Sequence, residues 1–582
     1  MPIEHRVSRR LARAALALAI GCAALGGAVG VDRESLAGGA SGGLPAAICR
    51  APAKLPDTVA EWSEGARLFA GLGRFHRKTS TQSTVAQAYF DQGMRYLWAF
   101  NHDEATRSFA RAAAEDPACA MCFWGVALTV GPNYNLPTMV AARAKVAWEA
   151  LQQAERRAAA APPVEQALIA ALAKRYAGPQ ALDPAAEMPV LTAYADAMAD
   201  VAAHFPDDLD VQTLAAEAAM NTNAWKLWGL DGSPAPGTEA IVARLEVVLA
   251  KNPGHPGANH YYIHAVEASP HPEKALPAAA RLAGVMPAAG HLVHMPAHIL
   301  QRVGRYADAA EANRKAAAAD IAYFTAVQAP DYYPVAYTGH NYQFLAYSAA
   351  MLGRKAETLA AARQSQAIAP AAMLLAMPGA DWYVAELYMA MVRFGLWDDI
   401  LAEPPPDERL KALTGGYLYA KATALAATGR TDAAKAALAA LAQHAATFAA
   451  DDGAGLNAAR DVFAVAVLVV KARIATTENK PDEAIALLTD AVAHEDRLAY
   501  DEPADWFFPV RHLLGAALLK AGRADAAEAV YREDLRRYPA NGWALSGLAQ
   551  ALAAQGRDAA PTRRQFTRAW ALSDIKLTAS AF

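Results

Sequence analysis

The feature that most constrains the fold is a recurring unit of about 34 residues. Several segments share one pattern, in which an apolar helical stretch is followed by a short turn such as Gly-Arg, a second helical stretch and often a proline. Clear copies are "YFDQGMRYLWAFNHDEATRSFARAAAEDP", "HILQRVGRYADAAEANRKAAAAD", "GYLYAKATALAATGRTDAAKAALAAL" and "HLLGAALLKAGRADAAEAVYREDLRRYPAN". One helical hairpin of this size cannot bury its apolar side alone, so neighbouring units are expected to stack.

Composition favours helices over sheets. Of the 582 residues, 54% are hydrophobic and 19% are charged, so most of the chain should fold. Alanine supplies much of the apolar share, and alternating runs rich in Val, Ile and Thr are scarce, which is typical of helical proteins. The formal net charge is -4, with no long basic block. Nucleic acid is therefore not expected as a partner.

The repeated segments resemble tetratricopeptide repeats (TPR), the helical-hairpin family with this period. The resemblance covers much of residues 86–575, with irregular inserts around 135–185, 222–236 and 322–334. It implies an all-α fold, a right-handed superhelical solenoid of antiparallel helix hairpins. It also implies that the first helix of each hairpin lines a concave groove that holds the ligand.

The first 30 residues have the pattern of a signal peptide. Arg6, Arg9, Arg10 and Arg13 precede "AALALAIGCAALGGAVG", which is too short for a comfortable membrane span. "SRR" partly resembles a twin-arginine signal, and "LAIGC", ending at Cys22, resembles a lipoprotein box; a disordered basic tail is the alternative. We expect export to the periplasm or cell envelope, with membrane attachment only through a lipid at Cys22.

The rest of the chain divides by composition and repeat pattern. A linker over 31–60 precedes N-terminal TPR-like helices with a CxxC motif over 61–205. Central repeats with a histidine-rich groove occupy 206–404, and further repeats occupy 405–582. The C-terminal repeats look regular, so capping or docking is their expected role.

Histidines recur at the repeat length. "NHYYIHAVE" contains His260 and His264, and "HLVHMPAH" contains His294 and His298 at the equivalent places one repeat of about 34 residues later. An even spread of the 15 histidines would put about two in residues 260–340, and the sequence has seven there. The two pairs should therefore lie on equivalent faces of neighbouring first helices and point into one groove.

The repeat register adds further residues to this groove. The expected starts of first helices fall near Leu209, Pro256, Gly290 and Gly339. This register places His291 and His340 at the beginning of two of these helices, on the groove side. In the earlier unit it places Glu217 and Asn221 on the same side.

These residues together form a candidate transition-metal site. Side chains four apart on a helix are about 5–6 Å apart at Cβ, and packed helices are about 10 Å apart, so imidazoles of adjacent repeats can converge. Neutral imidazole is a common ligand of Zn, Cu, Fe and Ni. The predicted ligands, enough for one or two ions, are His260, His264, His291, His294, His298, His340 and Glu217. Cu or Zn is favoured, and ligation by Glu217 would extend the choice to Fe or Mn.

Two other interpretations of the histidines remain open. They could hydrogen-bond an acidic or peptide ligand, or be structural. The metalloprotease motif HExxH is absent from the sequence, since Tyr261 follows His260 and Leu292 follows His291.

The CxxC motif stands at a predicted helix start. For Cys119 and Cys122 an oxidising compartment favours a disulfide, with a metal thiolate, a redox pair and free thiols as alternatives. Phe123 occupies the place where a c-type haem motif needs His, so that function is excluded. His102 falls in a turn, where a surface or capping role is expected.

Three further residues are expected to line the groove: Asn221, Trp124 and Asn341. For Trp124, core packing is the alternative. The stretches "CAMCFWG", "HLVHMPAHI" and "GHNYQFL" also resemble those of exported bacterial TPR proteins with a CxxC motif and histidine-rich repeats.

The sequence thus predicts an exported TPR solenoid whose groove carries a histidine-rich transition-metal site, for metal binding or metal-dependent chemistry on a small molecule or peptide. The alternative is a non-enzymatic scaffold that binds a peptide or protein partner in the cell envelope. No catalytic triad, phosphate-binding glycine loop or dinucleotide fingerprint stands out. Catalysis and substrate are therefore left open.

Overall fold

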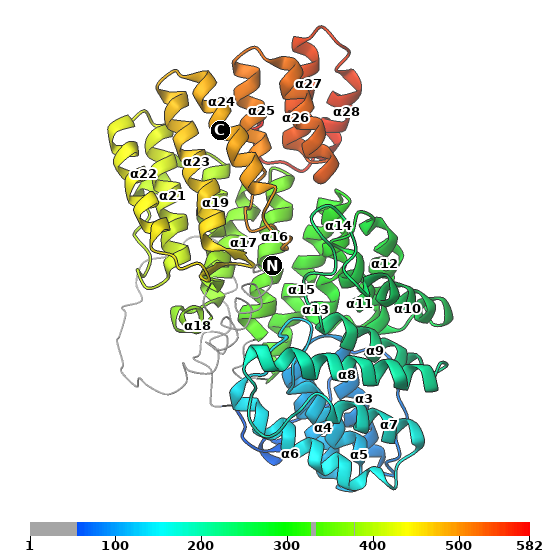
Figure 1. The fold of residues 1–582 in the computed structure, drawn as a ribbon. Coiled ribbons are helices and arrows are strands. Elements are labelled where there is room, and N and C mark those ends of the chain that lie inside the picture. The colour runs from blue at the N-terminus through cyan, green and yellow to red at the C-terminus, as the bar shows by residue number, and fades with distance from the viewer. Residues whose placement is uncertain (1–54, 328–332, 378) are drawn as a thin grey trace.

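The computed structural model describes residues 55–327, 333–377 and 379–582 (Figure 1). The expected signal peptide, the lipid-attachment residue Cys22 and most of the linker lie outside these residues. Among the helices described, none combines the length and apolarity needed for a membrane span.

Nearly all regular structure is helical. The N-terminal helices are α2 (Val59–Ser63), α3 (Thr84–Trp98), α4 (His102–Glu115), α5 (Ala120–Thr129), α6 (Ala141–Ala158), α7 (Pro163–Ala173) and α8 (Pro184–His204). The central helices are α9 (Leu209–Asn221), α10 (Thr238–Lys251), α11 (Pro256–Val266), α12 (Leu276–Val285), α13 (Gly290–His294), α14 (Pro296–Arg302), α15 (Tyr306–Val327), α16 (Gly339–Met351), α17 (Lys355–Ile368), α18 (Ala371–Ala376), α19 (Glu386–Arg393) and α20 (Trp397–Ala402).

The C-terminal helices are α21 (Lys411–Ala427), α22 (Thr431–Ala446), α23 (Ala459–Thr477), α24 (Pro481–Glu495), α25 (Val510–Lys520), α26 (Ala524–Arg537), α27 (Gly542–Ala554) and α28 (Ala560–Ala569). Short elements are η1 (Pro272–Ala275), η2 (Pro334–Thr338) and η3 (Ala380–Ala385), with a small antiparallel pair of strands, β1 (Gly453–Ala454) and β2 (Asn457–Ala458).

The helices form a solenoid. Helices adjacent in sequence pack on one another, and short connections such as that between α21 and α22 make the partners antiparallel. In Figure 1, α3–α9 form the lower part, α10–α17 the middle, and α21–α28 the upper part. The described chain is therefore the all-α solenoid of helix hairpins that the repeats predicted.

The turns inside the hairpins explain why the repeats carry glycine. Gly429 follows the C-cap of α21 with φ 75°, a left-handed conformation that glycine adopts without a steric penalty. At the equivalent place after α3 the chain has Phe100, with φ 53°. A bulky side chain in this conformation is unusual, and its position beside the histidines is described below.

First helices begin where the repeat register placed them. The helices α9, α11, α13 and α16 start at Leu209, Pro256, Gly290 and Gly339. Pro296 divides one first helix into α13 and α14, because proline has no N–H to donate. Met295 between them keeps helical angles of φ -50° and ψ -34°, so His291, His294 and His298 stay on one side.

Two of the expected inserts contain regular structure. The insert around 135–185 includes α6 and α7, and the insert around 322–334 begins inside α15, which runs to Val327. The insert around 222–236 is a loop with an antiparallel bridge between Trp228 and Pro234.

Candidate metal centre

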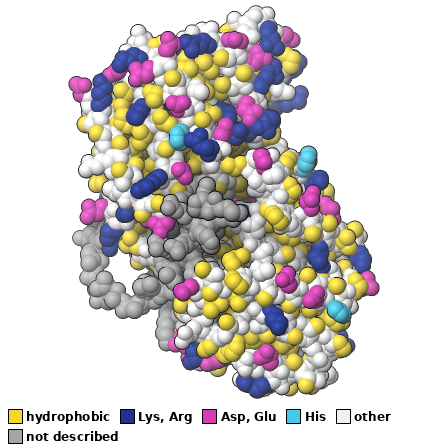
Figure 2. Space-filling view, viewed as in Figure 1, with side chains coloured by type: hydrophobic (Ala, Val, Ile, Leu, Met, Phe, Trp, Pro, Cys, Tyr) yellow, Lys and Arg dark blue, Asp and Glu magenta, His cyan; other side chains and the backbone are white. Residues whose placement is uncertain are grey.

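The six predicted histidine ligands form one cluster inside the central part of the solenoid. They come from α11, α13, α14 and α16, which are the first helices of three successive units. Figure 2 shows only isolated histidines on the face that it draws, whereas the clustered rings are buried, with His340 partly so. The prediction that these side chains converge is correct, although they converge in the interior rather than on an open groove.

The cluster contains two groups of three. In the first triad, His260, His264 and His291, the potential ligand nitrogens all lie within 4.8 Å of one another. The ring centroid of His260 is 5.0 Å from that of His264 and 4.9 Å from that of His291. Three imidazoles around one ion, with a further position open, is a common arrangement for zinc and copper.

The second triad, His294, His298 and His340, has the same limit of 4.8 Å between potential ligand nitrogens. The centroid of His294 is 4.6 Å from that of His298 and 4.9 Å from that of His340. The triads touch, since the ring of His264 lies 5.4 Å from that of His298. The arrangement thus offers two adjacent three-nitrogen sites.

In the first triad, hydrogen bonds to Nδ1 leave Nε2 available. His260 Nδ1 donates to the carbonyl oxygen of Trp98 at 2.6 Å, and His264 Nδ1 donates to Glu267 Oε1 at 2.8 Å. The Nε2 atoms of both rings are buried and have no hydrogen-bond partner among the described residues, and the same is true of both ring nitrogens of His291. A ring fixed through Nδ1–H carries its lone pair on Nε2, which is the metal-ligating form.

Hydrogen bonds to Nδ1 also fix two rings of the second triad. His294 Nδ1 lies 2.6 Å from Asn313 Oδ1, and the Asn313 amide is oriented because its Nδ2 donates to the Ala309 carbonyl. His298 Nδ1 donates to carboxylates. The two Nε2 atoms of His294 and His298 then approach to 2.7 Å. Two nitrogens at this distance need a proton or a cation between them.

Two carboxylates orient the cluster. Glu267, at the C-cap of α11, accepts from His264 through Oε1 and from His298 through Oε2, at 2.8 and 2.6 Å, so it connects the triads. Glu502, between α24 and α25, forms an ion pair with the same His298, with Oε2 2.7 Å from Nδ1. Carboxylate partners behind ligating histidines are a regular feature of metal sites. Glu267 and Glu502 also lie within 4.8 Å of His264 and His298 as potential ligands themselves.

Burial keeps most of the imidazoles neutral. It lowers the pKa of His264 and of His340 to about 3, and the positive charge of His298 adds to the effect. The pKa values of His260, His291 and His294 also lie well below the usual range, chiefly through burial. These rings are therefore in the uncharged form that binds cations.

His298 behaves in the opposite way. Burial alone would lower its pKa, but Glu502 and Glu267 outweigh that effect and raise it to about 10. Burial and the neighbouring Glu267 raise the pKa of Glu502 to about 7. The metal-free cluster therefore contains one cation, on His298, held between two carboxylates and the lone pair of His294.

Two strained aromatic residues cover the first triad. Phe100, with φ 53°, stacks on His264 and His291 with ring centroids 5.8 and 5.7 Å apart. Trp225, with φ 62°, lies with its ring 5.8 Å from that of His264. A non-glycine residue in the left-handed region costs about 1–2 kcal/mol, and such strain is concentrated at functional sites.

A cavity of about 250 Å³ lies against both triads. Its wall includes His264, His291, His298 and His340, and the carboxylic acids Asp501 and Glu502 also line it. The remaining wall is mainly aromatic and aliphatic. The centre is therefore not sealed inside the protein but faces a chamber of small-molecule size.

Four other predicted site residues lie elsewhere. Glu217 accepts from Asn221 Nδ2 at 2.7 Å and takes part in no potential metal group among the described residues, so the structure gives no support for it as a ligand. Trp124, Asn221 and Asn341 are buried, and the described cavity beside the histidines is lined by none of them. Trp124 is a core residue at 1% exposure, which was the alternative considered for it.

The sequence interpretation missed three contributors. Glu267 could have been found, because it follows His264 by three residues and so lies on the same helix side. Glu502 carries no local signal. The third is Phe100, which stacks on His264 and His291. His102, for which a surface or capping role was expected, is the first residue of α4, is buried at 3% exposure and stacks on Phe100 at 5.4 Å.

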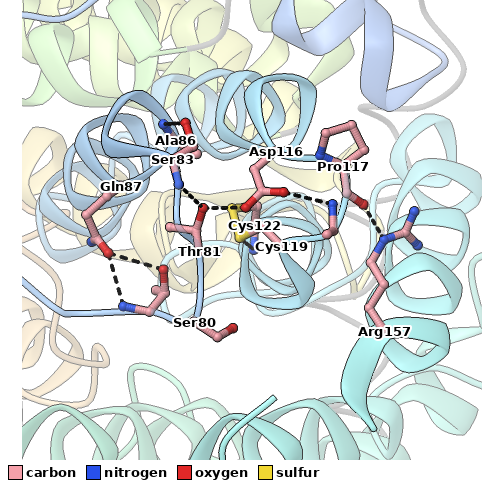
Figure 3. The surroundings of a disulfide bond; sticks show 12 residues. Ser80, Thr81, Ser83, Ala86, Gln87, Asp116, Pro117, Cys119, Cys122 and Arg157 are labelled. Carbon is pink, nitrogen blue, oxygen red and sulfur yellow. Dashed lines mark hydrogen bonds between the residues drawn. A yellow bond between two sulfur atoms is a disulfide. The ribbon is translucent and has the colours of Figure 1, made fainter. Parts of the chain in front are cut away.

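Cys119 and Cys122 form a disulfide at the start of α5 (Figure 3). Both are buried, and Cys119 Sγ accepts from Cys122 N at 3.1 Å as the N-cap of the helix. Figure 3 shows the hydrogen bond that the Thr81 hydroxyl donates to Asp116, just before this turn. It also shows the hydrogen bond that Arg157 donates to the carbonyl oxygen of Pro117. In this state the pair has no thiolate to offer a metal, which leaves the histidines as the candidate ligands.

Comparisons with known proteins add little to this description. No family model matches the sequence, and no curated protein matches it significantly. Similar solved structures include the human IFIT1 dimer with m7Gppp-AAAA (12% identity, 85% of this chain and 92% of that chain, TM-score 0.30). Others are the APC/C hetero-tetramer Cut9-Hcn1 (13%, 83% and 76%, 0.32) and yeast Tom70 (12%, 81% and 96%, 0.31). Similarities this weak do not bear on function, and the fold class rests on the helices themselves.

Proposed function

We propose that this solenoid protein binds transition-metal ions through its two histidine triads. The observation that carries the proposal is in the first triad, where His260 and His264 have buried, unpartnered Nε2 atoms on rings whose Nδ1 atoms are fixed by hydrogen bonds. Leaving such acceptors unsatisfied inside a protein costs about 1–3 kcal/mol each. A metal ion would satisfy several of them at once. In the second triad, the Nε2 atoms of His294 and His298 lie 2.7 Å apart, and an ion could replace the proton between them.

The donor set favours Zn or Cu. Three neutral imidazoles per ion suit these metals, and their geometry leaves a position for water or another ligand. If Glu267 and Glu502 ligate rather than orient, the mixed nitrogen and oxygen set would suit Fe or Mn. A bound ion would supply Lewis acidity or, for Cu, Fe and Mn, electron transfer.

We also propose that the protein works outside the cytoplasm, in the periplasm or cell envelope. The support is the arrangement of four arginines before a short apolar stretch at the N-terminus. The disulfide between Cys119 and Cys122 fits an oxidising compartment.

Metal quantification tests the proposal. The purified chain, stripped with a chelator and reloaded with Zn²⁺ or Cu²⁺, should retain stoichiometric metal after dialysis. The double variant His260→Ala plus His294→Ala removes one ligand from each triad and should lose it. His271→Ala, an exposed histidine at a turn, is the matched control and should bind like the wild type. Absence of retained metal in the folded wild-type protein would refute the proposal.

A second function is favoured by a separate feature, a cavity of about 1040 Å³ next to the first. Its wall combines aromatic residues such as Trp228 and Phe448 with charges of both signs, including Arg409, Lys411 and Asp452. This size and chemistry suit a short peptide or a partner segment. Binding there would be independent of metal and unaffected in the double histidine variant.

A further inference from the structure

We infer that the cavity of about 250 Å³ beside the triads binds a single-ring phenol or catechol whose hydroxyl oxygen ligates the metal. The inference rests on the proposed metal function and goes further by naming the chemical class of the ligand. Position, size, wall chemistry and an unpartnered oxygen of Glu502 each support it.

The cavity lies against both triads. His264 and His291 of the first triad and His298 and His340 of the second line it. An ion held by either triad would therefore lie beside the cavity. A small molecule in the cavity can fill an open coordination position without displacing a histidine.

The volume limits the ligand to one ring. A cavity of about 150 Å³ lined by apolar side chains can hold benzene. At about 250 Å³, this cavity has room for a benzene ring with one or two substituents. A peptide or a fused polycyclic compound would not fit without rearrangement.

The walls suit an aromatic ring. Trp225, Tyr337 and Tyr383 contribute aromatic surface, and Leu136 and Val335 contribute aliphatic surface. The Tyr337 ring already stands edge-on to His291, with centroids 4.8 Å apart. A flat ligand ring between such side chains gains both burial and edge-to-face contacts.

A carboxylate of the wall suits a second hydroxyl group. Glu502 lines the cavity beside His298, and its Oε2 lies 2.7 Å from His298 Nδ1. Glu502 Oε1 is buried and lacks a hydrogen-bond partner in the described residues, while Oε2 is held by His298 and Tyr500. This oxygen can accept a hydrogen bond from a second hydroxyl, which catechol has and phenol lacks.

The small cavity adjoins the larger one. Trp225, Leu374 and Leu456 line both this cavity and the larger one of about 1040 Å³, so the two adjoin. Trp225 stands at the boundary with its left-handed backbone. We therefore expect a ligand to enter from the larger cavity past this side chain.

The test uses the full chain loaded with Zn²⁺, which does not oxidise the probe. The probe is 4-nitrocatechol, whose absorption shifts when it coordinates a metal. We expect saturable binding to the zinc-loaded protein that is about tenfold or more tighter than binding to the zinc-free chain, which is the effect of a metal–oxygen contact worth about 1.4 kcal/mol. Metal content is measured after each titration, to show that the probe has not removed the zinc.

Variants make the result specific to the cavity. Ala336→Trp fills the chamber from η2 and should abolish probe binding while zinc stays bound. Ala442→Trp, at an exposed place on α22, is the matched control and should bind the probe normally.

The outcomes separate this inference from the proposed function. Zinc retained without probe binding, or equal probe binding by the zinc-free chain, would each overturn the inference and leave the metal site standing. Failure to retain zinc would overturn both.

Discussion

Glu502 forms an ion pair with His298, with Oε2 2.7 Å from Nδ1, although the two residues come from different parts of the solenoid. His298 lies on α14 in the central repeats, and Glu502 lies in the connection between the C-terminal helices α24 and α25. The C-terminal repeats, expected only to cap or dock, thus supply a polar group to the candidate metal centre.

This contact predicts an effect on metal affinity. Glu502→Gln keeps the size of the side chain but removes the negative charge behind His298. Loss of such an outer partner typically weakens metal binding by about 10–100-fold, which a competition titration with a chromophoric chelator would measure. Glu483→Gln, an exposed change on α24, should have no effect. Equal affinities in the two variants would show that Glu502 does not act on the metal centre.

Gly257 allows α11 to pack closely against the end of α3. A Cβ atom at Gly257 would stand 2.4 Å from the Trp98 ring, so Gly257→Ala must push the helices apart. The bond of His260 Nδ1 to the Trp98 carbonyl, now 2.6 Å, should lengthen as a result. We expect a loss of about 1–3 kcal/mol in stability and weaker metal binding. Gly254→Ala, with its nearest neighbour at 3.6 Å, should change neither property.

The left-handed backbone of Phe100 leads us to expect an unusual order of stability for two variants at this position. Both Phe100→Ala and Phe100→Gly lose the ring that covers the first triad, at a cost of about 3–5 kcal/mol. Because φ is 53°, the glycine variant should be the more stable of the two by about 1 kcal/mol. At Phe90, inside α3, the order should reverse, since alanine is the better helix former by about 1 kcal/mol. Thermal unfolding of all four variants gives the comparison, and the same order at both positions would contradict the left-handed geometry of Phe100.

The buried carboxyl group of Glu187 should make the stability of the folded protein depend on pH. It is 4% exposed, and burial raises its pKa to about 7 against the opposing effects of the Met139 N–H and Arg175. Between the ordinary pKa of about 4.3 and pH 7, the unfolded chain has released this proton and the folded chain has not. The free energy of unfolding should therefore fall as pH rises through this window, by at most about 1.4 kcal/mol per pH unit.

The variant Glu187→Gln should lack this contribution, so its melting temperature relative to the wild type should improve from pH 4.5 to 7. The exposed Glu239→Gln is the control and should run parallel to the wild type. A constant difference between Glu187→Gln and wild type would mean that Glu187 titrates normally in the folded protein.

Much of the fold followed from the repeat register. The starts of α9, α11, α13 and α16 fall on the expected residues because turn glycines and closing prolines fix where hairpins begin and end. The same register also predicted that six histidines would lie on the same side of neighbouring first helices. It was uninformative for the region around 135–185, where α6 and α7 are helical without the repeat signature.

The site was only partly predictable, because periodicity describes neighbouring units alone. Glu217 was included as a ligand from its place in the register, yet it pairs with Asn221 in an earlier unit. The contribution of Glu502 could not be predicted, because a repeat period relates only neighbouring units and Glu502 comes from a distant connection that lies against α14. Phe100 was missed for a related reason, since an aromatic residue at a turn normally marks no special conformation.

The position of Glu502 also has a consequence for biosynthesis. The central histidines leave the ribosome well before α24 and α25, so during that interval His298 lacks one of the two carboxylates that hold its charge. A chain that binds metal at that stage would do so without the Glu502 carboxylate beside His298, and the last repeats would then pack around an ion already in place. Chains cut short before residue 502 should accordingly exchange their metal faster than the finished protein.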